Sequence, residues 1–148
     1  MSLRVAHVAG GGRKRPERIG NWWRRWRGRR VAATVNFRNT RIYEKAIALV
    51  QLSCVVVAEL PVGCGFLADQ LRRASSSVVL NFAEGHDKGS LREQRRYLRI
   101  ARGSAMEVAA ALDVGLHLGA VGSAHHARGI ELCDHLVRML FRFRQQGR

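Results

Sequence analysis

The stretch of residues 67–90, LADQLRRASSSVVLNFAEGHDKGS, constrains the fold of this chain more than any other part of it. Its apolar residues recur at steps of three and four, which is the spacing of an amphipathic helix. A polar corner begins at His86, and beyond it Ser90 and Glu93 stand three residues apart, as in the capping box that starts a helix. One segment therefore predicts a helix, a tight corner and the start of a second helix.

The same periodicity continues on both sides of this segment. It predicts four helices, over residues 37–60, 65–86, 90–118 and 123–145. The corners between them are short, which favours antiparallel neighbours in an all-α, up-down-up-down four-helix bundle. The first helix carries two neighbouring apolar rows, and this face is wider than contact with two helices needs. We therefore expect the first helix to pack against another subunit as well.

The central region also resembles a known family. The resemblance is carried by QLRRA at 70–74, NFAEG at 81–85, KGS at 88–90, YLRIARGS at 97–104 and Glu107. On these motifs the chain is identified as a member of a four-helix-bundle family that includes proteins encoded in intervening sequences of bacterial 23S ribosomal RNA genes. Relatives of that family include the accessory variability determinants of diversity-generating retroelements. The resemblance extends over residues 37–143 and implies a ring of subunits, a homopentamer.

Three positions depart from the family pattern: Phe82 stands where isoleucine is expected, Tyr97 where phenylalanine is, and Ser75 where alanine is. These changes leave the expected bundle intact. The motif residues Asn81 and Glu84 are the most notable polar groups on an otherwise apolar face, and Gly85 follows them. They are open to two interpretations, a polar site or a structural hydrogen-bond network at the end of a helix. We favour the structural interpretation, because buried polar groups usually serve the specificity of packing.

The charge of the chain is large and uneven. Lysine and arginine number 26 against 11 acidic residues, which gives a net charge of +15. Residues 1–34 hold ten of the basic residues and one acidic residue, Glu17. We expect residues 1–35 to form a disordered basic tail and residues 36–148 to form the bundle. Such a balance predicts a polyanionic partner, either nucleic acid, an acidic protein or an anionic lipid surface.

Arginines cluster along the predicted third helix at steps of three, one, three and three. On a helix this spacing gives one basic stripe about 15 Å long. A solvated helix face is the alternative, since charged runs on surfaces are common. The stripe and a second arginine pair on the preceding helix are our candidate nucleic-acid contacts in the bundle: Arg92, Arg95, Arg96, Arg99 and Arg102, with Arg72 and Arg73.

The tail adds a segment in which tryptophans are interleaved with arginines, consisting of Trp22, Trp23, Arg24, Arg25 and Trp26. Indole rings stack on nucleobases while arginines pair with phosphates, so these five residues are also candidate nucleic-acid contacts. The same mixture suits an anionic membrane interface, which we rank lower. A solvated arm, or a start codon assigned too far upstream, would explain the segment without any function.

Motifs for catalysis and for metal binding are missing from the sequence. It has no HExxH, no CxxC, no GxSxG and no phosphate-binding loop, so we expect no enzyme, no cofactor and no metal. Three separated cysteines, Cys54, Cys64 and Cys133, indicate buried thiols in a reducing compartment, and we expect a cytoplasmic protein. We expect neither a membrane span nor a secretory signal, because the apolar runs are too short.

These observations favour a non-enzymatic, oligomeric bundle that binds RNA or DNA through a basic helix face. The alternative is a protein–protein adaptor whose basic surface docks a reverse transcriptase of a diversity-generating retroelement, and the retroelement relatives suggest it. Membrane association through the tail is the third hypothesis.

Overall fold

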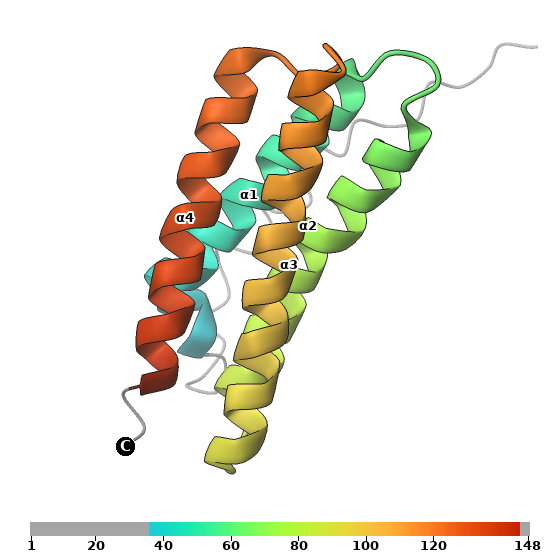
Figure 1. Cartoon of the computed structure of the whole chain (residues 1–148). Coiled ribbons are helices and arrows are strands. Elements are labelled where there is room, and N and C mark those ends of the chain that lie inside the picture. The colour runs from blue at the N-terminus through green and yellow to red at the C-terminus, as the bar shows by residue number, and fades with distance from the viewer. Residues whose placement is uncertain (1–35, 146–148) are drawn as a thin grey trace, which may run out of the picture. The chain divides into compact units, whose positions relative to one another are not determined.

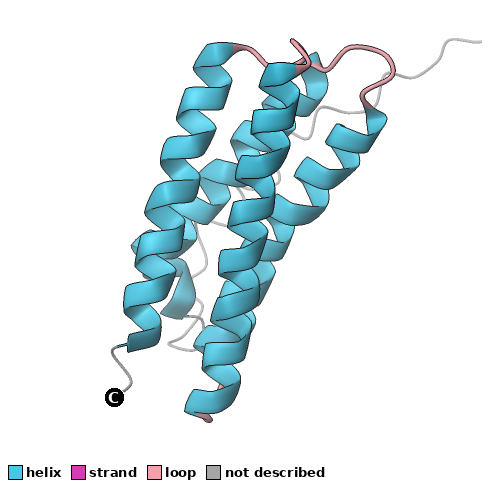
Figure 2. Ribbon diagram, in the orientation of Figure 1, coloured by secondary structure: helices cyan, strands magenta, loops and turns pink. Residues whose placement is uncertain are grey.

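The structure, a computed structural model, describes residues 36–145 of the chain. A 3-10 turn, η2 (Asn36–Asn39), precedes four helices, and no strand occurs among the described residues (Figures 1 and 2). The helices lie within one or a few residues of their predicted bounds: α1 (Arg41–Glu59), α2 (Gly65–His86), α3 (Leu91–His117) and α4 (Ser123–Gln145). The predicted all-α fold with four helices is therefore confirmed.

Local sequence explains where α1 begins and ends. Thr40 caps its N-terminus, since the Thr40 Oγ1 atom accepts a hydrogen bond from the Tyr43 N–H at 3.2 Å and donates one to the Phe37 carbonyl at 2.7 Å. Pro61 follows the C-cap, and Gly63 adopts a φ of 96° in the turn to α2.

The start of α3 differs from its prediction in one respect. Ser90 is the N-cap residue, as expected, and its carbonyl accepts the Gln94 N–H at 2.9 Å. Its hydroxyl makes no capping hydrogen bond, so the capping box that Ser90 and Glu93 predict is not formed. At the other end of α3, Gly119 takes a φ of 66° and its N–H bonds to the Leu116 carbonyl at 2.9 Å.

Neighbouring helices run in opposite directions. Between α2 and α3, Gln70 Nε2 donates to Glu107 Oε2 at 2.9 Å, and the hydroxyls of Ser77 and Ser104 lie 2.8 Å apart, so numbers that rise along α2 fall along α3. Figure 1 shows the connections between consecutive helices at alternate ends of the bundle. Helix α1 packs against α2 on one side and α4 on the other, which closes the four helices around one core.

The core consists of the apolar stripes that the periodicity predicts. On α3 the apolar stripe is buried along its length: Leu98, Ala101, Ala105, Val108, Leu112 and Gly115. One end of the core is aromatic, because the Phe143 ring packs edge-on against Phe82 and stacks on His86, with centroid separations of 6.0 and 5.9 Å. Phe37 also packs edge-on against His86, with ring centroids 6.4 Å apart. The bundle therefore has a continuous interior from end to end.

The two apolar rows of α1 differ in burial. Ile42, Ala46, Leu49 and Val56 of one row are buried, whereas the other row stays on the surface. In that second row Cys54 is exposed, and the remaining members are only partly buried: Tyr43, Ile47, Val50 and Val57. The expectation of buried thiols is therefore wrong for Cys54 and right for Cys133, which faces the interior.

Candidate nucleic-acid interface

The arginines of the predicted stripe lie on the surface of α3. Arg92, Arg96 and Arg99 are exposed, and Arg95 and Arg102 are half-buried. None of the ion pairs between residues 36 and 145 includes any of these five side chains. Among the described residues, the stripe is therefore neither neutralised by carboxylates nor hidden in the core.

Helix α4 extends this positive surface. The guanidinium of Arg144 lies 5.1 Å from the centroid of the Phe141 ring, and that of Arg102 lies 5.9 Å from the same centroid. The Arg102 contact joins α3 to α4, the Arg144 contact lies within α4, and the two cation–π contacts restrict both arginines. We call the combined surface the basic face, and it consists of Arg92, Arg95, Arg96, Arg99, Arg102 and Arg144.

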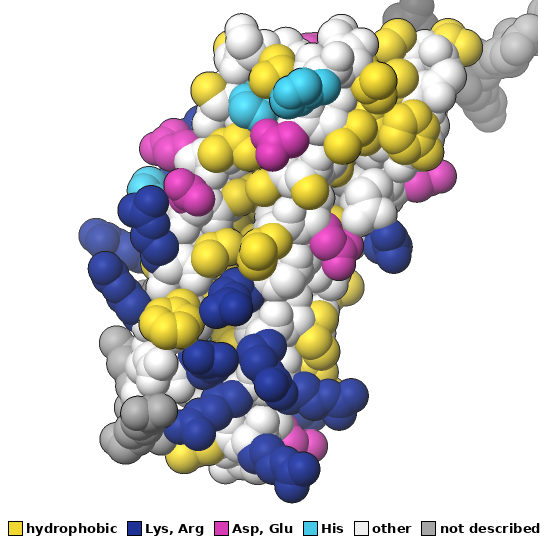
Figure 3. All heavy atoms as spheres, viewed as in Figure 1, with side chains coloured by type: hydrophobic (Ala, Val, Ile, Leu, Met, Phe, Trp, Pro, Cys, Tyr) yellow, Lys and Arg dark blue, Asp and Glu magenta, His cyan; other side chains and the backbone are white. Residues whose placement is uncertain are grey.

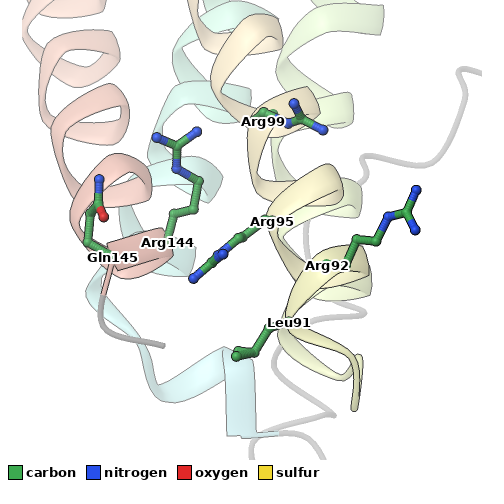
Figure 4. A pocket seen from close by; sticks show the side chains of 6 residues that line it. All are labelled: Leu91, Arg92, Arg95, Arg99, Arg144 and Gln145. Atoms are coloured by element: carbon green, nitrogen blue, oxygen red, sulfur yellow. The ribbon is translucent and has the colours of Figure 1, made fainter. Parts of the chain in front are cut away.

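An open hollow of about 560 Å³ lies within the basic face, where the start of α3 meets the end of α4. Figure 4 shows Arg95 extending toward α4, and Arg144 leaving α4 on the side of α3 before its guanidinium turns along α4. The lining comprises Leu91, Arg92, Arg95 and Arg99 of α3 together with Arg144 and Gln145 of α4. Helical spacing on α3 alone gave no sign of this hollow, because a third of its lining comes from residues about fifty positions later. In the sequence, the only available signal was the pair of arginines near the end of α4, Arg142 and Arg144.

On the face that Figure 3 shows, basic and acidic side chains gather toward opposite ends of the bundle. Lysine and arginine gather over one half, and most acidic side chains and histidines lie over the other. The acidic half is largely paired: His126 Nε2 lies 2.7 Å from Asp113 Oδ1, and Arg128 donates to Glu131 at 2.5 Å. The hydrogen bond from Arg128 lowers the pKa of Glu131. Local pairing thus leaves these acids little capacity to neutralise the basic face.

The structure does not bring Arg72 and Arg73 to the basic face. They lie on α2, between the contacts Gln70–Glu107 and Ser77–Ser104, and so beside the middle of α3. Arg72 lies 3.8 Å from Asp69, and Arg73 donates to the Gln70 side chain. The pair therefore forms a separate, partly compensated site.

The motif residues Asn81, Glu84 and Gly85 have structural surroundings. Asn81 Nδ2 donates to both the carbonyl and the hydroxyl oxygen of Ser77, at 2.9 and 3.0 Å. Glu84 pairs with Lys88 at 2.6 Å, and that hydrogen bond raises the pKa of Lys88. Gly85 is buried against α3. These contacts fit the structural interpretation of the motif.

The remaining candidates and exclusions concern other parts of the chain. Trp22, Trp23, Arg24, Arg25 and Trp26 lie outside the described residues, so their role stays a prediction. Within residues 36–145, no three histidine, cysteine or acidic side chains gather in a way that suits a metal ion. No helix in this part of the chain combines the length and the apolar character needed to cross a membrane.

Comparison with known protein families gives a match. A family model described as 23S rRNA-intervening sequence protein matches residues 38–142. This range includes all of α1, α2 and α3 and nearly all of α4. A search of curated proteins finds none that matches.

Proposed function

The chain belongs to the 23S rRNA-intervening sequence protein family, and from this premise we propose that it is a non-enzymatic, oligomeric bundle that binds nucleic acid through the basic face. One observation carries the proposal. Five arginines follow one another along α3 without a carboxylate partner among the described residues, and Arg144 joins them from α4.

The energetics of this arrangement favour a polyanionic partner. Like charges three or four residues apart on a helix destabilise it by about 0.2–0.5 kcal/mol per pair. A phosphate backbone relieves that repulsion, and each contact releases a condensed counterion. Guanidinium groups also match the geometry of phosphate oxygens. Binding of this kind has a steep salt dependence and weak sequence preference, because phosphate contacts position a protein without reading bases.

The surface row of α1 supports an oligomer. Ile47 and Val50 are partly buried without belonging to the hydrophobic core, beside the exposed Cys54. A partner subunit packed on this row would bury it and would bring several basic faces into one assembly. We propose the pentamer that the family resemblance implies.

The non-enzymatic part of the proposal is supported by the family description, which names no reaction. Surface histidines have ordinary partners in the described region: His125 Nδ1 lies 3.3 Å from Glu59, and His126 pairs with Asp113. Such contacts between helix ends suit structural roles.

Light scattering of the full chain, with and without a short RNA, tests assembly and binding in one measurement. We expect about five times the subunit mass of 16.6 kDa without RNA, and a higher mass when RNA is added at low salt. An unchanged mass with RNA at low salt would contradict nucleic-acid binding, and a monomer would contradict the assembly.

A further inference from the structure

We propose that the hollow between α3 and α4 holds one unpaired nucleotide, so that the basic face binds single-stranded RNA or DNA in preference to a duplex. The inference rests on the proposed function and adds the class of nucleic acid to it. Its basis is the composition of the hollow, whose lining combines guanidinium groups of both helices with an apolar side chain and an amide.

The size and shape of the hollow suit a small ligand. Its volume of about 560 Å³ lies inside the range of about 300–1,000 Å³ that small-molecule sites occupy. In Figure 4, Leu91 and Arg95 extend from α3 toward α4, and Arg144 leaves α4 on the side of α3 with its guanidinium directed away from that of Arg95. Arg92 and Arg99 project from the other side of α3 in this view. Cationic side chains of both helices thus line one opening.

The arginines of the lining provide the site for a phosphate. No acidic residue lines the hollow, so an anion that enters it relieves the repulsion among these arginines. The Phe141 ring, 5.1 Å from the Arg144 guanidinium, helps to fix one of the two walls. Bidentate hydrogen bonds from guanidinium to phosphate are among the strong ones in proteins.

The remaining lining suits a nucleobase. Leu91 is 49% exposed at the first position of α3, and Gln145 contributes to the lining from α4. An apolar side chain covers one face of a base, and a carboxamide both donates and accepts at a base edge. A surface that only followed a phosphate backbone would need neither group.

A duplex cannot use this site without disruption. Its bases are paired and stacked inside the helix, so a base must be unstacked before it enters a protein pocket. A single strand presents its bases freely, and proteins recognise such strands by stacking and edge contacts. The hollow therefore favours single strands, while the surrounding arginines attract either form.

The test compares fluorescence anisotropy of the full chain with a labelled single strand of about 12 nucleotides, as RNA and as DNA, and with the blunt duplex of the same sequence at the same salt. The double variant Leu91→Ala/Gln145→Ala alters the hollow without changing charge. The matched control is Gln51→Ala/Leu80→Ala, at exposed positions of α1 and α2.

We expect the unmodified chain to bind the single strand about tenfold more tightly than the duplex. The Leu91/Gln145 variant should lose most of that preference and keep its salt dependence, whereas the control keeps both. Equal or tighter binding of the duplex, or a full preference in the Leu91/Gln145 variant, would overturn this inference alone. Failure of every probe to bind in a salt-dependent manner would overturn the proposed function with it.

Discussion

A Cβ atom placed on Gly85 of α2 would lie 2.9 Å from the Cβ atom of Tyr97 on α3. It would also lie 3.3 Å from the carbonyl oxygen of Gln94. The two backbones therefore approach so closely beside this corner that only glycine fits without a shift. Gly85, the last residue of the NFAEG motif, therefore has a packing role, because it allows α2 and α3 to come into close contact beside the corner.

Replacing Gly85 by alanine should lower the free energy of unfolding by about 1–3 kcal/mol, because the crowded atom belongs to the stem of Tyr97 and cannot rotate away. Urea denaturation measures this change. Gly103→Ala is the matched control on α3, since nothing lies within 4 Å of its added Cβ. That substitution should raise stability by about 0.5–1 kcal/mol through helix propensity. Equal effects at the two sites would contradict the close approach.

The hydroxyl contact between Ser77 and Ser104 yields a second prediction. Ser104 is 5% exposed and lies at the contact of α2 with α3. Its replacement by alanine removes one partner of Ser77, which also accepts from Asn81, and should cost about 1 kcal/mol of stability. Ser76→Ala is the control, because Ser76 is exposed and bonds only within its own helix. We expect its free energy of unfolding to change by less than about 0.5 kcal/mol in thermal or urea unfolding. If Ser104→Ala leaves the free energy of unfolding unchanged, the Ser77–Ser104 hydrogen bond does not contribute to stability.

Most of the fold follows from the sequence because one physical cause dominates it. Apolar residues at steps of three and four must face a common core, and this explains why the four predicted helices form and why residues such as Leu98 and Leu112 of α3 are buried. Exposure within the second row of α1 was harder to predict, because apolarity alone does not say which row faces the other helices. Cys54 illustrates this: it belongs to an apolar row with helical spacing, and its side chain is nevertheless exposed.

Burial of Cys133 makes stability depend on alkaline pH. Burial raises the pKa of the Cys133 thiol from its ordinary value of 9.0 to about 12. Between these values the unfolded chain releases a proton that the folded chain keeps, so the free energy of unfolding falls as pH rises. We compare the free energy of unfolding of the native protein with that of Cys133→Ala. As pH rises from about 8 to about 10, the native protein should lose about 1.4 kcal/mol relative to the variant. Urea unfolding of both proteins at the two pH values measures it. A constant difference would show that the thiol is accessible.

The surface row of α1 gives a test of assembly. Val50→Asp places a carboxylate where we propose that a second subunit packs, and an unpaired charge in an apolar contact is strongly unfavourable. Because Val50 lies outside the hydrophobic core, the variant should keep its helical circular dichroism and scatter light as a smaller species. Leu80→Asp on α2 is the control, at a residue that is 66% exposed. Retention of the full mass by Val50→Asp would place the subunit contact elsewhere.

The candidate interface could be predicted only in part. Helical spacing identified the five arginines of α3, because residues on one face recur at fixed steps. It did not identify Phe141 or the hollow beside Arg95, which depend on how the end of α4 meets the start of α3. The sequence also placed Arg72 and Arg73 among the candidate contacts, as a second pair on the preceding helix, and antiparallel packing places them beside the middle of α3.

The central claim is that the arginines of α3 contact phosphates, and the salt dependence of binding tests it most directly. The variant Arg95→Gln/Arg96→Gln/Arg99→Gln removes three charges from the basic face. Its control, Arg72→Gln/Arg73→Gln/Arg128→Gln, removes three charges from exposed positions elsewhere. The affinity of each protein for a single-stranded RNA is measured across a range of salt concentrations. We predict that the α3 variant binds at least about tenfold more weakly and that its slope of log affinity against log salt falls by about 2, while the control keeps the native slope. An α3 variant with native affinity and slope would contradict the account.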